Sequence, residues 1–209
     1  MPEPTVWITF VAAVLAMQTM PGPDMLLVVA RGVGEGRRAA FGCVLGFAGA
    51  GIVQIPALAL GLATVLQASP VAYETLRWSG AVYLVYTGLT YLISPARPVA
   101  GFASASPSAV AAFRQGFLNN LMNPKVLVFM LALLPQFVDP LRGPVALQFV
   151  LLGITMKCCG FAVNGTVALL SGWVGNWLSA RQAFIQWQRR LVGTVLVGLG
   201  LRLALGTRS

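Results

Sequence analysis

The sequence contains no histidine, only five acidic residues and only three cysteines. The carboxylates form no cluster, so the chain offers no obvious ligand set for a tight structural metal site. An odd number of cysteines, without the spacing of a secreted protein, argues against a disulfide framework. Charged residues make up only 9% of the chain, whereas a soluble domain carries about 25%. We therefore expect no metal or other cofactor, and the composition excludes an ordinary soluble domain.

Long hydrophobic runs occupy most of the chain, and 57% of its residues are hydrophobic. A helix that crosses a bilayer needs about 20 mainly apolar residues. The candidate runs cover residues 5–29, 40–66, 71–93, 113–137, 145–172 and 190–206. The last run is the shortest, so an arrangement with five spans stays open. The pattern predicts an all-α integral membrane protein with six transmembrane helices.

The arginines indicate how the chain is oriented in its membrane. The net charge of +9 would also suit a nucleic-acid-binding protein, but these arginines lie in short loops, where basic residues set membrane orientation. The first, third and fifth loops hold Arg31, Arg37, Arg38, Arg97, Arg114, Arg181, Arg189 and Arg190. The opposite ends hold Arg77, Arg142, Arg202 and Arg208. We therefore predict that the odd-numbered loops are cytoplasmic, and we expect no nucleic acid as a partner.

Two of the hydrophobic runs are interrupted by polar motifs. The first interruption is Pro21-Gly22-Pro23-Asp24, and the second is Asn123-Pro124-Lys125. A bilayer core offers no water to a freed N–H or C=O, so a broken helix persists only where its backbone is buried in protein or lines a cavity. In transporters such a cavity is often the substrate site. The two breaks, one with an acid and one with a base, are therefore the best candidates for a site.

The two breaks occupy matching positions in the two halves of the chain. The segment 94–112 is rich in Pro, Ser, Ala and Gly, which is typical of a linker. It separates residues 1–93 from residues 113–209, and each part holds three runs. An odd number of spans in each half inserts the second half upside down, as in many secondary transporters. We therefore predict two inverted three-helix halves, joined by a cytoplasmic linker, with the first helix of each half broken.

Asp24 is the first candidate for a functional side chain. A carboxylate in the middle of a membrane helix costs about 2.5–3.5 kcal/mol, so it usually faces a cavity or a partner. One interpretation is a group that couples transport to protons or binds a substrate ammonium. The other is an N-cap of the second half of the broken helix, since Asp24 follows Pro23 and precedes an apolar stretch. The two interpretations are compatible.

Lys125 is the matching base. If the fourth run starts at Phe113, Lys125 lies about 18 Å along the helix, which is past the middle of a hydrocarbon core about 30 Å thick. We therefore favour recognition of a substrate carboxylate, or pairing with Asp24. The alternative is a side chain that extends to the membrane interface.

Other polar residues inside the runs extend this candidate site. Asn120 and Asn123 precede the second break, where their amides would either bind freed backbone groups or line a cavity. Gln54 lies in the second run, and an interhelical hydrogen bond is its simpler interpretation. Lys157 has no acidic neighbour on its own helix, and it shares a face with Gly160 and Asn164. We predict a substrate site that contains Asp24, Lys125, Asn120, Asn123, Gly22, Gln54 and Lys157.

Small residues follow one face of the second run. Gly42, Gly46 and Ala50 recur at four-residue spacing, which lets helix backbones approach closely. Such a face would also permit a homodimer. The cysteines, Cys43, Cys158 and Cys159, lie inside hydrophobic runs, so we expect them to be buried packing residues.

Five motifs are distributed along the chain: Thr19-Met-Pro-Gly-Pro-Asp24, Gly36-Arg-Arg-Ala-Ala-Phe-Gly42, Gly80-Ala-Val-Tyr-Leu-Val-Tyr-Thr-Gly88, Phe113-Arg-Gln-Gly-Phe-Leu-Asn-Asn-Leu-Met-Asn-Pro-Lys125 and Leu134-Pro-Gln-Phe-Val138. With these motifs the chain resembles the LysE/RhtB family of amino-acid exporters, and the resemblance covers nearly the whole chain. The resemblance implies proton-driven efflux of basic or neutral amino acids across the bacterial cytoplasmic membrane, and no enzymatic activity. One departure is Gln54, near a position where many members carry histidine.

These observations lead to one main hypothesis and two alternatives. In the main hypothesis, a zwitterionic amino acid binds with its ammonium near Asp24 and its carboxylate near Lys125, and protonation of Asp24 drives release. The first alternative is a membrane thiol–disulfide carrier that uses Cys43 and Cys158, with Lys157 lowering the pKa of the second thiol. The second alternative is a structural subunit of a membrane complex.

Overall fold

The computed structural model describes residues 4–68, 70–93 and 108–205, and within these residues every regular element is a helix. The long elements are α1 (Pro4–Thr19), α2 (Pro23–Glu35), α3 (Arg37–Ala68), α4 (Pro70–Ile93), α5 (Ala109–Leu121), α7 (Val145–Leu169), α8 (Ser171–Ser179) and α9 (Gln182–Leu205). The short ones are α6 (Pro124–Val128), a π-helical turn η1 (Phe129–Leu133) and two 3₁₀ turns, η2 (Leu134–Phe137) and η3 (Pro140–Arg142).

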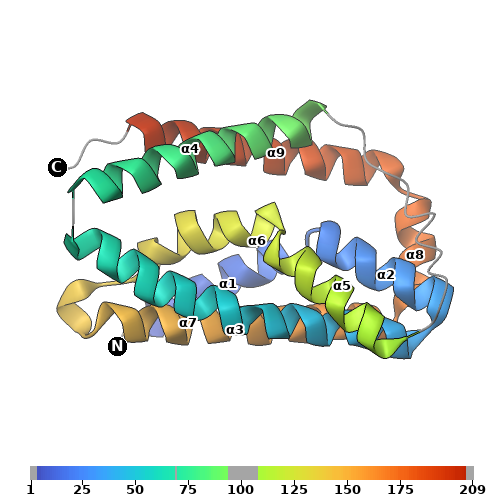
Figure 1. Ribbon diagram of the computed structural model, residues 1–209. Helices are drawn as coiled ribbons and strands as arrows, with labels where there is room; N and C mark the ends of the chain where they lie inside the picture. The colour runs from blue at the N-terminus through green and yellow to red at the C-terminus, as the bar shows by residue number, and fades with distance from the viewer. Residues whose placement is uncertain (1–3, 69, 94–107, 206–209) are drawn as a thin grey trace.

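Both predicted breaks are present, and each separates two helices that meet at an angle. The axes of α1 and α2 differ by 50°, and α5 differs by 44° from the segment Pro124–Phe137. Figure 1 shows both bends near the middle of the molecule. Each second helix starts at a proline, Pro23 or Pro124. Proline fits the first turn because its missing N–H would have no helical partner there.

The described residues include helices that are long and apolar enough to cross a membrane. Two helices, the first 25 residues of α3 and all of α7, are long and apolar enough to cross a membrane, and each bent pair adds one if it is a single span. The finding therefore supports two to four candidate spans. The helices α4 and α9 carry Glu74, Arg77, Arg189, Arg190 and Arg202, which lower their mean hydropathy. The predicted all-helical membrane architecture is confirmed at this coarser level.

Several predicted boundaries shift in the structure. The helix α9 begins at Gln182, so the last run is part of a 24-residue helix rather than a short segment. The helix α5 begins at Ala109, with the Ser108 hydroxyl accepting a hydrogen bond from the Ala111 N–H. The end of the predicted linker 94–112 is therefore helical, and its residues 94–107 lie outside the described residues.

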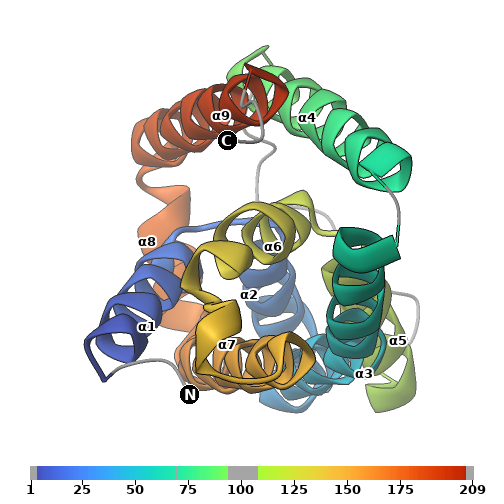
Figure 2. The same ribbon diagram turned by 90° about the vertical axis from the view of Figure 1, so that its left-hand side faces the viewer.

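The helices form a main group and a separate pair. Figures 1 and 2 show α4 and α9 side by side along one edge, with the other long helices grouped opposite. Leu84 of α4 and Leu196 of α9 are buried with Val128 of α6, which joins the pair to the main group. The backbones of α4 and α9 nearly touch, because a Cβ at Gly88 would lie 2.7 Å from the Gly193 carbonyl oxygen.

The small residues of α3 face α5 of the same chain. A Cβ at Gly46 would lie 2.2 Å from the Phe113 carbonyl oxygen, and one at Gly116 would lie 2.4 Å from the Cys43 carbonyl oxygen. The prediction that this face allows close helix approach is confirmed. Because Gly42 also meets α5, the face is occupied within the chain and supplies no surface for a second copy.

The cysteine and arginine predictions need two corrections. Cys43 is buried, as expected, but Cys158 is exposed and Cys159 is half-buried on α7. Arg31 does not lie in a loop. It is buried in α2, where its guanidinium donates hydrogen bonds to the Glu35 carboxylate and to Gln115 Oε1 of α5. The first loop is much shorter than expected, because Gly36, with a φ of 89°, alone separates α2 from α3.

Candidate functional site

The two breaks bind each other reciprocally. Asp24, just after the first break, accepts hydrogen bonds from Asn119 Nδ2 at 2.7 Å and Asn120 Nδ2 at 2.6 Å, at the end of α5. Lys125, just after the second break, donates to the carbonyl oxygens of Met17 at 2.9 Å and Met20 at 2.8 Å, at the end of α1. The first turn of α2 therefore binds the end of α5, and the first turn of α6 binds the end of α1.

The N-cap interpretation of Asp24 is wrong. Gly22 is the N-cap of α2 and makes no side-chain cap, while Asp24 is the second residue of the helix. Its carboxylate is buried and accepts from two amides of α5. The positive end of the α2 dipole also favours a negative charge there. In the second half, Asn123 is the capping residue, since its Oδ1 accepts from the Lys125 N–H at 3.0 Å.

Lys125 does not extend to a membrane interface. Its side chain is buried, and its ammonium binds the carbonyl groups of Met17, in the last turn of α1, and of Met20, just beyond this helix. Gly22 leaves room for it, because a Cβ at Gly22 would lie 3.1 Å from Lys125 Nζ. Both Asp24 and Lys125 belong to the described residues, and no direct ion pair joins them.

Lys157 lies closer to the Asp24 network than the sequence suggested. Its ammonium donates to Gln54 Oε1 at 2.6 Å, to Asn120 Oδ1 at 2.7 Å and to the Phe47 carbonyl oxygen at 3.3 Å. Asn120 therefore bridges the two charges, because its nitrogen binds Asp24 and its oxygen binds Lys157. Gln54 makes the expected interhelical hydrogen bond, from its Nε2 to the Asn120 carbonyl oxygen at 3.1 Å.

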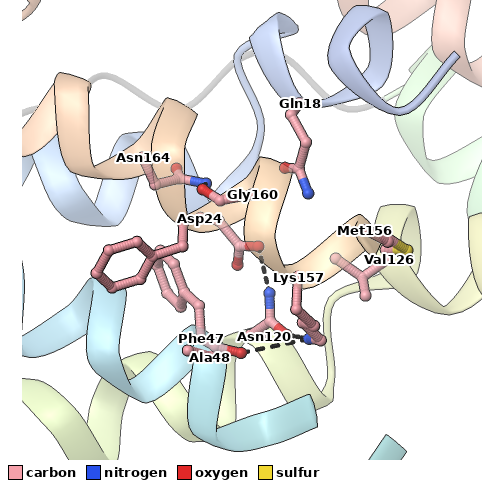
Figure 3. Close-up of a pocket in the computed structure, with 11 residues that line it drawn as sticks. Gln18, Asp24, Phe47, Ala48, Asn120, Val126, Met156, Lys157, Gly160 and Asn164 are labelled. Carbon is pink, nitrogen blue, oxygen red and sulfur yellow. Dashed lines mark hydrogen bonds between the residues drawn. The ribbon is translucent and has the colours of Figure 1, made fainter. Parts of the chain in front are cut away.

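A cavity opens beside this network. The cavity is small and partly open to its surroundings. Figure 3 shows Asp24, Asn120 and Lys157 joined by hydrogen bonds at its wall. The lining residues are Gln18, Asp24, Phe47, Ala48, Asn120, Val126, Met156, Lys157, Gly160, Phe161 and Asn164. The cavity therefore combines one acid, one base and three amides with an apolar wall.

The predicted site residues divide into two groups. Three of them, Asp24, Asn120 and Lys157, line the cavity. The others, Lys125, Asn123, Gly22 and Gln54, do not line it but hold the broken helix ends and the polar side chains in place. The Nδ2 group of Asn123 is buried without a hydrogen-bond partner among the described residues.

Sequence reasoning missed Gln18 and gave little weight to Asn164. The signal for Asn164 was its position on one face of α7 with Lys157 and Gly160, and all three line the cavity. The signal for Gln18 was a single amide in an apolar run just before the first break. Gln18 lies against α7, because a Cβ at Gly160 would lie 2.7 Å from Gln18 Nε2.

Known proteins and one family model match nearly the whole chain. The family model described as LysE type translocator matches residues 15–207. An uncharacterized membrane protein of Pseudomonas aeruginosa is 33% identical over 96% of this chain and 95% of its own length. One of Vibrio cholerae is 29% identical over 95% of this chain and 96% of its own length.

A relative with a named activity is the leucine efflux protein of Klebsiella pneumoniae, which is 26% identical over 95% of this chain and 94% of its own length. No solved structure matches this chain significantly. Because the family model covers nearly the whole chain, including both breaks, the chain belongs to the family of LysE type translocators.

Proposed function

We propose that this chain exports an amino acid with an apolar side chain across the bacterial cytoplasmic membrane, and that inward proton flow drives the export. The observation that carries the proposal is the cavity where two broken helices meet, with the Asp24 carboxylate and the Lys157 ammonium on its wall. The family and the leucine efflux relatives support a membrane translocator of amino acids rather than an enzyme.

The polar wall of the cavity suits the head group of an amino acid. The substrate ammonium lies against Asp24, the acid among the lining residues. The substrate carboxylate approaches Lys157 and replaces the longest of its hydrogen bonds, the one to the Phe47 carbonyl oxygen at 3.3 Å. Lys125 was the expected partner of the carboxylate, but its ammonium is directed to α1 and not to the cavity. We therefore assign the carboxylate to Lys157, and the positioning of α1 to Lys125.

The apolar wall suits an aliphatic side chain. Phe47, Val126, Met156 and Phe161 line the cavity next to the polar network. Beyond Asp24 and Lys157, the lining residues carry no charge that would pair with a charged substrate side chain. The activity named for the leucine efflux relatives agrees with this choice. Leucine is therefore the substrate to test first, with lysine as the comparison.

Asp24 also provides the coupling to protons. As a carboxylate it binds the substrate ammonium from the cytoplasm. After the cavity turns outward, a proton from outside takes the place of the ammonium on the carboxylate, and the amino acid leaves. With Asp24 protonated, the cavity turns back toward the cytoplasm, and Asp24 releases its proton there. The chain has no histidine. The exchange of a proton for the substrate ammonium on Asp24 needs none.

The predicted architecture of six spans in two inverted halves belongs to this proposal. Under such symmetry, α1 and α2 correspond to α5 and α6, α3 to α7, and α4 to α9. Two contacts support this correspondence, because α3 packs on α7 and α4 packs on α9, each helix on its own counterpart. The packing of α3 on α5 is matched by that of α7 on α1. The reciprocal contacts of Asp24 and Lys125 follow the same correspondence.

The two alternatives gain no support from the described residues. A thiol–disulfide carrier needs accessible thiols, but Cys43 is fully buried in the core between α2, α3, α7 and α8. Reconstitution of the purified chain, in wild-type form and without cysteines, tests all three functions. We expect both proteins to export leucine from liposomes and to leave lysine inside. Lack of amino-acid transport by folded wild-type protein would refute the proposal.

A further inference from the structure

Asn164 of α7 lines the cavity and carries a buried side-chain oxygen. Its side-chain Nδ2 donates to the Gly160 carbonyl oxygen at 2.9 Å. Its Oδ1 has no hydrogen-bond partner among the described residues, although the residue is only 4% exposed. The orientation of the amide is fixed, because the Gly160 carbonyl can only accept and must face the nitrogen. Asn164 and Asp24 line the same cavity, as Figure 3 shows.

A buried acceptor without a partner is unfavourable, so it points to a group that arrives with a donor. The Asp24 carboxylate can also accept further hydrogen bonds. Each of its oxygens accepts one amide N–H, and a carboxylate offers about four lone-pair positions. Two helices that line the cavity, α2 and α7, therefore carry acceptors that can take a further hydrogen bond. A group that satisfies both needs at least two N–H donors and gains from a positive charge.

We propose that Asn164 Oδ1 and the Asp24 carboxylate together bind the primary ammonium of the substrate, so that Asn164 determines specificity for an unmodified α-amine. This inference rests on the proposed function, because it assigns a second contact to the same substrate group. A primary ammonium has three N–H donors, an N-methylated amine has two, and an N,N-dimethylated amine has one. Each methyl group removes a donor, and a hydroxy acid lacks the positive charge altogether.

Two isosteric variants isolate the acceptor. In Asn164→Thr, the hydroxyl donates to the Gly160 carbonyl and keeps an acceptor for the cavity. Thr155 and Thr166 of the same helix already donate to the carbonyl four residues earlier. Asn164→Val has the same shape as threonine but no acceptor. Gln188→Leu is a matched control, because Gln188 is also a buried amide whose oxygen has no partner in the described part of the chain, and it does not line the cavity.

The test measures transport of leucine and N-methyl-leucine in liposomes. We expect Asn164→Val to raise KM for leucine about tenfold with little change in kcat, since it loses one hydrogen bond to a charged group. Its preference for leucine over N-methyl-leucine should fall. Asn164→Thr should lie closer to wild type in both quantities, and Gln188→Leu should match wild type. If Asn164→Val keeps both the KM and the preference of wild type, the inference is wrong and the proposed function stands.

A second measurement needs no variant. Leucine, N-methyl-leucine and N,N-dimethyl-leucine are added to the wild-type protein, and the stabilisation against thermal unfolding gives their relative affinities. We expect the affinity to fall with each methyl group. Equal affinities would overturn the inference, and failure of leucine itself to bind or be transported would overturn the proposed function as well.

Discussion

Replacing Asn120 with leucine should strongly destabilise the junction between the two halves. The side chain keeps its size but loses two hydrogen bonds, the donor to Asp24 at 2.6 Å and the acceptor from Lys157 at 2.7 Å. A hydrogen bond to a charged group contributes about 1.5–3 kcal/mol, so the expected loss is about 3–6 kcal/mol. For a chain of this length, about 2–4 °C of Tm accompanies each kcal/mol. The melting temperature should therefore fall by at least about 6 °C.

Asn119→Leu is the matched control for this prediction. Asn119 donates a single hydrogen bond to the same carboxylate, at 2.7 Å, so its loss should cost about half as much. Thermal unfolding of purified protein, followed by tryptophan fluorescence, measures both variants. A double mutant that combines Asn120→Leu with Lys157→Met should lose less than the sum of the single mutants, because both remove the same hydrogen bond. Equal losses for Asn119→Leu and Asn120→Leu, or strict additivity, would refute the bridging role of Asn120.

Two further predictions concern the broken helix and the helix contacts. Lys125→Met should lower the melting temperature and kcat but leave KM for leucine unchanged, because it frees the α1 carbonyls without touching the cavity. A raised KM at unchanged stability would instead place Lys125 in the substrate site. Gly46→Ala should prevent normal folding, since its methyl group would meet the α5 backbone. The methyl group that Gly61→Ala adds on the same helix would have no described atom within 4 Å. A folding assay by gel filtration that finds both variants alike would contradict this packing.

The two breaks could be predicted from the sequence because proline and charge inside an apolar run have few explanations in a membrane. Their reciprocal binding could not be predicted in the same way. It depends on which helix ends lie opposite each other, and the local sequence of Asp24 allowed an N-cap equally well. The small-residue face around Gly46 could be predicted because residues at four-residue spacing lie on one side of a helix.

The choice between the two lysines needed the tertiary structure. Lys125 and Lys157 both interrupt apolar runs, and the sequence favoured Lys125 because of its match with Asp24. The structure uses Lys125 to hold α1 and brings Lys157 to the cavity through Gln54 and Asn120. Likewise, no spacing rule would reveal that the Asn164 nitrogen binds the Gly160 carbonyl while its oxygen lacks a partner among the described residues.

The central claim is that Asp24 both binds the substrate ammonium and exchanges it for a proton. The most direct test compares leucine efflux from liposomes with and without an inward proton gradient, for wild type, Asp24→Asn and Asp139→Asn. Asp139 is a control acid on an exposed turn outside the cavity. We predict that the gradient accelerates efflux by wild type and Asp139→Asn, and that Asp24→Asn loses this acceleration while remaining folded. Full gradient-driven efflux by Asp24→Asn would contradict the account.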